Sequence, residues 1–115
     1  MPNPDALLKS LEKKMRELSL RNADYRDLML SKAKAQEDYS VSYAKKMFEL
    51  KGGGQSITLI PKLSEGDKHV AELKFKLDVA EALVRANLQS QKNIHAVMDG
   101  IRSELAWLKA EMGQG

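Results

Sequence analysis

Apolar residues in the second half of the chain recur at alternating spacings of three and four residues, without interruption, from position 70 to position 112. Eleven of the thirteen positions are apolar, and the series is Val70, Leu73, Leu77, Ala80, Val84, Asn87, Gln91, Ile94, Met98, Ile101, Leu105, Leu108 and Met112. This spacing averages the 3.5-residue repeat of helices that supercoil around a partner. It predicts a helix over about 67–112 with one stripe facing another helix.

A helix of matching length is expected over about 5–51. Asn3 or Asp5 can cap its beginning, Pro4 is tolerated in a first turn, and Gly52 to Gly54 supply the stop. Its stripe, in the same alternating spacing, is Leu8, Leu11, Met15, Leu18, Asn22, Tyr25 and Met29. Past Met29 the stripe slips by one residue and continues through Ala33, Ser40, Ala44 and Met47, which indicates a stutter.

Two helices of nearly equal length on either side of a short connection predict an all-α, antiparallel, coiled-coil-like hairpin, occupying 1–115 as a single domain. The tip, 52–66, is expected to be irregular or to contain a short strand. The segment from Gln55 to Ile60 is rich in β-branched residues, and Pro61 would end such a strand or place it at an edge.

Polar residues interrupt both stripes, and a buried Asn at such a position commonly fixes register or oligomeric state. If Lys51 lay opposite Gly66, Asn22 would face His95 and Asn87 would face Leu30. The alternative is a pair of stripes that opens to solvent at mid-length.

A second apolar set lies outside the stripe of the second helix: Phe75, Val79, Ala82, Leu83, Ala86, Val97 and Trp107. One hairpin interface cannot cover both faces, and a hairpin of this size buries little core for its length. We therefore expect self-association, most economically a two-fold dimer that forms a helical bundle. Scattered surface apolar residues are the alternative.

Sequence patterns typical of enzymes are missing. There is no cysteine, and the glycines before Ser56 lack the Lys of a phosphate-binding loop. The spacings of His69 with Glu72 and of His95 with Asp99 are isolated pairs, whereas metal sites in helical bundles use several. We expect no catalysis, cofactor or metal. The longest uncharged run, from Gly52 to Pro61, has ten residues, too few to span a membrane, so a cytoplasmic protein is expected.

The net charge of +3 raises nucleic acid as an alternative partner. The excess comes from the first helix, with eleven Lys or Arg against eight Asp or Glu, while the second helix has seven of each. The candidate phosphate contacts are Lys13, Lys14, Arg16, Arg21 and Arg26. Acidic residues are interleaved throughout, which favours a solvated helical face over a dedicated nucleic-acid surface.

The tip offers the favoured contact for another protein, because loops carry function more often than packed helices do. The predicted contact residues are Ile57, Thr58, Leu59 and Ile60, with Phe75 and Trp107 as apolar anchors. Alternatively, the apolar tip residues merely cover the end of the bundle.

The segment from Met98 to Lys109, MDGIRSELAWLK, resembles the C-terminal helix of small uncharacterised helical proteins of phages and prophages. The resemblance implies an accessory protein that modifies a host or phage machine by binding it, in the host cytoplasm. The alternative function is that of an accessory nucleic-acid-binding factor in phage DNA replication or recombination. The two-helix architecture is also similar to that of β-type prefoldin subunits, which implies a chaperone subunit as a further alternative.

Overall fold

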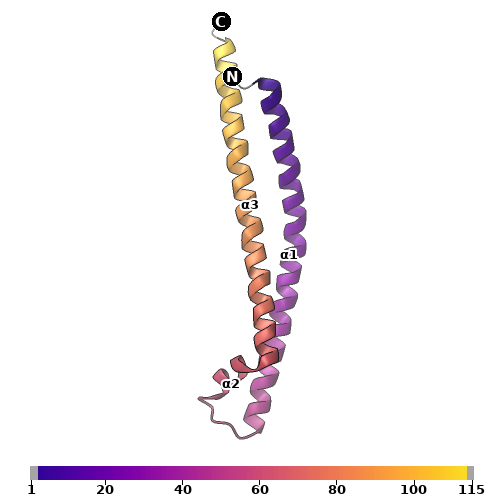
Figure 1. Cartoon of the computed structure of the whole chain (residues 1–115), viewed down its shortest axis with the longest axis vertical. Helices are drawn as coiled ribbons and strands as arrows, with labels where there is room; N and C mark the ends of the chain where they lie inside the picture. The colour runs from indigo at the N-terminus through magenta and orange to yellow at the C-terminus, as the bar shows by residue number, and fades with distance from the viewer. Residues whose placement is uncertain (1–2, 114–115) are drawn as a thin grey trace. The chain divides into compact units, whose positions relative to one another are not determined.

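Three helices account for the secondary structure of residues 3–113, which are the residues that the computed structural model describes. They are α1 (Pro4–Gly52), α2 (Ile60–Gly66) and α3 (Lys68–Gly113), shown in Figure 1. No strand occurs within 3–113. The all-helical class and the two long helices are thus confirmed, with bounds within one residue of those predicted.

Local hydrogen bonds explain where α1 begins and ends. The side chain of Asn3 accepts a hydrogen bond from the backbone N–H of Asp5 at 2.9 Å, so Asn3 caps the first turn. At the other end, the N–H of Gly54 donates to the carbonyl of Lys51, and that of Gln55 donates to the carbonyl of Leu50. These two bonds form a Schellman motif, which requires a left-handed residue, and Gly54 has a φ of 80°.

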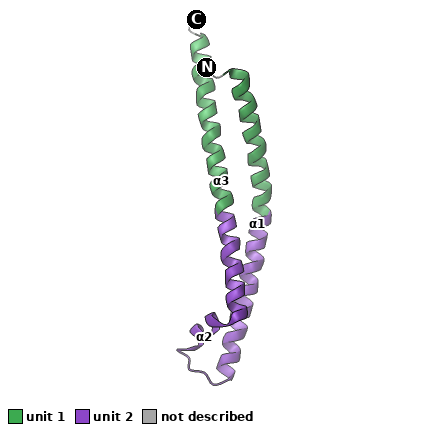
Figure 2. Ribbon diagram, in the orientation of Figure 1, with its two compact units in different colours: residues 1–26, 86–115 green, residues 27–85 purple. Residues whose placement is uncertain are grey.

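Residues 3–113 fall into two compact units, drawn in separate colours in Figure 2. Unit 1 contains residues 3–26 of the first half and 86–113 of the second. Unit 2 contains 27–85, and therefore the whole tip. In each unit a segment of α1 runs antiparallel to a segment of α3.

The stripe predicted for α3 is confirmed by its burial. Every buried residue of this helix belongs to the predicted series: Val70, Leu77, Ala80, Val84, Asn87, Ile94 and Met98. Five further members of the series are half-buried, and only Met112, at the end of the helix, is exposed.

The stripe predicted for α1 is partly wrong. Leu11, Leu18 and Tyr25 are less exposed than their neighbours, as predicted, but Leu8, Met15, Asn22 and Met29 are exposed. The buried and half-buried positions instead follow the series Leu7, Leu11, Lys14, Leu18, Tyr25, Leu28, Lys32, Ala35, Tyr39, Ser42 and Lys46. This series keeps the three-four register past Met29, so burial shows no stutter. Lys and Tyr can occupy such positions because their long apolar stems pack while the polar end reaches water.

The strand expected over Gln55 to Ile60 is not found, and the tip contains helix α2 instead. Pro61 lies in the first turn of α2, a position where proline is favourable because its missing N–H would have no partner there. A lone strand would also leave its backbone groups unpaired, since residues 3–113 provide no second strand.

The facing pairs predicted from the tip are also wrong. The side-chain amide of Asn87 donates to the carbonyl of Arg21 at 3.0 Å, so Asn87 lies beside Arg21 and not beside Leu30. Asn22, which was expected to face His95, is exposed. Within unit 2 the reason is visible, because the tip lies beside the last turns of α1. Ile60 of α2 lines one groove with Met47, and Asp67, just before α3, pairs with Lys46 and not with a residue nearer the end of α1.

Candidate protein-interaction site at the tip

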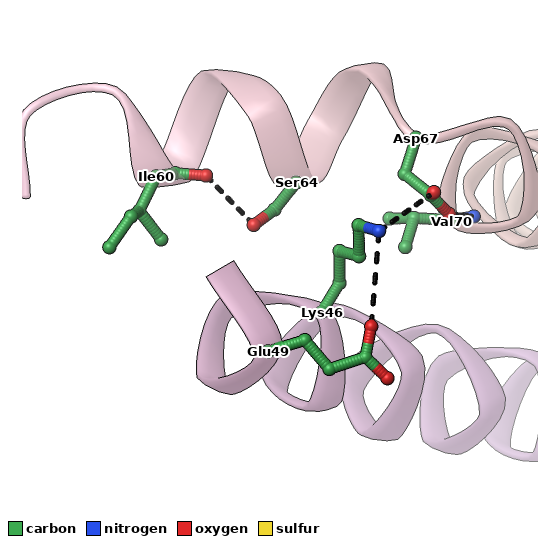
Figure 3. A network of polar contacts seen from close by, with 6 residues as sticks. All are labelled: Lys46, Glu49, Ile60, Ser64, Asp67 and Val70. Carbon is green, nitrogen blue, oxygen red and sulfur yellow. Dashed lines mark hydrogen bonds and ion pairs between the residues drawn. The ribbon is translucent and has the colours of Figure 1, made fainter. Parts of the chain in front are cut away.

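The start of α3 is fixed to α1 by a polar network around Asp67, drawn in Figure 3. One carboxylate oxygen of Asp67 accepts a hydrogen bond from the N–H of Val70 at 3.1 Å and caps α3. The other lies 3.5 Å from the Nζ of Lys46, which also lies 3.8 Å from Glu49. The cap, followed by the neighbouring Lys46, lowers the pKa of Asp67 below its ordinary value.

Helix α2 is held by two buried residues one turn apart. Ile60 is only 5% exposed, and Ser64 is fully buried. The hydroxyl of Ser64 donates to the carbonyl of Ile60 at 2.8 Å, which satisfies its polar group without a partner outside the helix (Figure 3). The tip therefore contains a short helix with one buried face.

An apolar groove of about 520 Å³ lies where the end of α1 meets this folded tip. It is lined by Ala44, Met47, Phe48, Lys51, Ile57, Ile60 and Pro61. Phe48 comes from α1 and Ile57 from the segment before α2, and the two are 80% and 81% exposed. Lys51 is the one charged residue among the lining side chains.

Of the predicted tip contacts, Ile57 and Ile60 line this groove, although Ile60 does so as a buried residue. Thr58 and Leu59 are exposed and lie outside the lining. The hydroxyl of Thr58 is hydrogen bonded to that of Ser56 at 2.9 Å. Leu59, the residue before α2, lies about one helical turn from Leu63 of α2, and both side chains are exposed.

The two predicted anchors are exposed and do not line the groove. Phe75 belongs to unit 2, on the part of α3 that follows the tip, and Trp107 belongs to unit 1. Phe48 lines the groove but was not among the predicted contact residues. The signal that could have indicated it is an apolar side chain that lies outside the predicted stripe and next to Met47, in the last turns before the glycines.

The predicted nucleic-acid contacts all lie in unit 1, on one helix. Lys14 forms an ion pair with Glu17 at 3.0 Å, and Arg21 forms one with Asp24 at 3.6 Å. The remaining three, Lys13, Arg16 and Arg26, are exposed. At about 100° per residue, the five positions point around most of the helix circumference instead of forming one stripe. Nucleic-acid binding stays a prediction.

No group of three or more His, Cys, Asp or Glu side chains suited to a metal ion occurs within 3–113. None of the helices in this range combines the length and the apolar content that crossing a bilayer requires.

Comparison of the chain with protein-family models, with curated proteins and with solved structures finds no significant match. The resemblance to phage accessory proteins and the prefoldin-like alternative therefore stay predictions. The strand on which the prefoldin likeness drew is not present within 3–113.

Proposed function

We propose that this chain is a non-enzymatic, self-associating protein-interaction module, acting in the cytoplasm as a phage-type accessory protein that binds a host or phage protein through its tip groove. The observation that carries the proposal is the exposure of Phe48 and Ile57, which line one apolar groove from two separate segments of the chain. Keeping such side chains in water is unfavourable, and apolar patches with polar rims are typical of interaction sites.

The groove also suggests the chemistry of its ligand. Its lining is apolar apart from Lys51, which is exposed. A segment with one or two apolar side chains next to a carboxylate would fill the groove and pair with this lysine. The fixed position of α2 supports this role, because a preformed surface loses less conformational entropy on binding than a flexible loop.

The test compares three forms of the protein as bait in the lysate of a candidate host. The groove variant carries Phe48→Ser with Ile57→Ser and keeps Ile60, which the folded tip requires. The control is Val41→Ser, which removes an exposed apolar side chain of the same helix outside the groove lining. Circular dichroism verifies that all three forms are equally helical.

The expected result is a set of proteins captured by the wild type and by Val41→Ser and lost with the groove variant. Each captured protein is then titrated as a purified component against all three forms. Capture that is the same for the groove variant and the wild type would refute the role of the groove.

Self-association is measured separately by light scattering behind a sizing column, at low and high salt, with and without DNA. A salt-insensitive oligomer that ignores DNA is expected, because an apolar interface does not release counterions. A monomer that shifts only with DNA at low salt would refute self-association and support the nucleic-acid alternative.

A further inference from the structure

A second apolar face lies on α3 within unit 2, away from the residues that this helix buries. Phe75, Val79 and Leu83 are all exposed, Phe75 by 69%, while Leu77, Ala80 and Val84 between and beside them are buried. Residues four apart lie on the same side of a helix. The three exposed side chains therefore form one short row, which we call the outer row.

The outer row is symmetric about its middle residue. Phe75 and Leu83 lie four residues before and after Val79. If two copies of α3 cross antiparallel on a two-fold axis at Val79, each Phe75 packs beside the Leu83 of the other copy. A two-fold interface requires this kind of self-complementary surface.

The charges beside the outer row match the same arrangement. In the antiparallel pairing, Glu72 of each copy falls opposite Ala86 of the other, so that the long side chain of Arg85, the adjacent residue, gives two opposite-charge pairs by symmetry. Within 3–113 neither Glu72 nor Arg85 forms an ion pair of its own. Lys76 falls opposite Ala82 of the other copy, a small side chain that leaves room for the lysine stem. A parallel pairing would place Glu72 beside Glu72 and Lys76 beside Lys76.

The size of the outer row sets the expected strength of the contact. A phenylalanine can bury about 150–250 Å², so the three side chains together present on the order of 300 Å² of apolar area. Two copies would bury on the order of 600 Å², and with the polar share typical of homodimers the interface reaches on the order of 900 Å². Stable complexes bury about 1,200–2,000 Å², so the contact should be reversible, with a dissociation constant in the micromolar range.

We propose that the outer row is the surface on which a second copy of this chain binds, antiparallel, with the two-fold axis at Val79. This inference rests on the self-association in the proposed function and adds its surface and its geometry. It does not involve the tip groove, so the two surfaces can be tested independently.

The first experiment uses the absence of cysteine from the chain. Val79→Cys places a thiol on the proposed axis, and Ala86→Cys is its matched control, because residue 86 is two helical turns further along the same face. In the antiparallel dimer the two copies of residue 86 are separated by fourteen residues of helix, or about 21 Å along the axis. Mild oxidation should therefore link Val79→Cys into a covalent dimer at least about tenfold faster than Ala86→Cys.

The second experiment tests complementarity at the axis. Val79→Glu and Val79→Lys should each raise the dissociation constant at least about 100-fold, because like charges meet on the two-fold axis. An equal mixture of the two variants should regain a heterodimer. Sedimentation over about 1–300 μM measures these equilibria, and circular dichroism verifies folding.

Each result has a separate meaning. Equal linking of Val79→Cys and Ala86→Cys would refute the antiparallel arrangement. A wild type that dimerises while Val79→Cys does not link, and while Val79→Glu has no effect, would refute the outer row but leave self-association intact. A wild type that is monomeric over the whole concentration range would refute this inference and the self-association in the proposed function, without affecting the tip groove.

Discussion

Replacing Leu77 with Ala tests the packing between α1 and α3 most directly. Leu77 is 2% exposed and belongs to the buried series of α3. Loss of three carbon atoms forfeits about 2.4 kcal/mol of transfer free energy at about 0.8 kcal/mol for each methylene. A partly collapsed cavity raises the total to about 3 kcal/mol, within the range of about 2–5 kcal/mol for buried Leu→Ala changes.

The matched control is Leu20→Ala, because Leu20 is 66% exposed on α1. Its effect should stay within about 0.5 kcal/mol. For 115 residues the entropy of unfolding is about 0.24 kcal/mol/K, so Leu77→Ala should lower Tm by about 12 °C. Urea and thermal unfolding followed at 222 nm, at one protein concentration for all forms, give both values. Equal losses for Leu77→Ala and Leu20→Ala would refute the assignment of the buried face of α3.

Three further predictions concern polar and backbone features. Asn87→Ala should lower the free energy of unfolding by about 1–2 kcal/mol, because it deletes the bonds of a buried amide, whereas Asn22→Ala should change it by less than about 0.5 kcal/mol in the same urea titrations. The lowered pKa of Asp67 means that its cap stabilises α3 above the ordinary carboxyl pKa of about 3.9 and is lost as the pH falls through the lower, folded value. The hydrogen-exchange protection factors of the first turn of α3, taken relative to the intrinsic exchange rate at each pH, should therefore fall in acid, and an Asp67→Asn variant with the same pH profile would contradict this. Gly54→Ala should destabilise the chain by about 1 kcal/mol because φ is positive there, while Gly53→Ala, whose added Cβ meets only ordinary contacts, should be neutral or stabilising in thermal unfolding.

The second long helix and its buried face could be predicted from sequence almost completely, because Leu77, Ile94 and Met98 belong to one register that is unbroken from 70 to 112. The buried face of the first helix could not be predicted, because Leu8, Met15 and Met29 form an apolar row one residue away from the row that is buried. Apolar content cannot choose between the rows when long polar side chains also pack through their stems. The choice depends on the partner helix, which the local pattern does not contain.

The tip shows a different limit of sequence reasoning. β-Branched residues from Ile57 to Ile60 favoured a strand, but strand formation depends on a neighbouring strand, and helix α2 needs only its own backbone. The position of Ile57 at an exposed apolar site was predictable. The groove itself was not, because it requires Phe48 and Pro61 to come together from opposite sides of three glycines.

The folded tip also has a consequence for the order in which the chain folds. The contact between Lys46 and Asp67 closes a loop of 21 residues, whereas the bond between Asn87 and Arg21 joins residues 66 apart. Loop closure becomes less probable roughly as the three-halves power of loop length, so the first contact should form about fivefold more readily. The packing of α1 against α3 should thus start beside the tip and proceed toward the two ends of the chain. Pulse-labelled hydrogen exchange during refolding should protect residues 70–84 before residues 94–108, and the reverse order would show that the tip is not the nucleus.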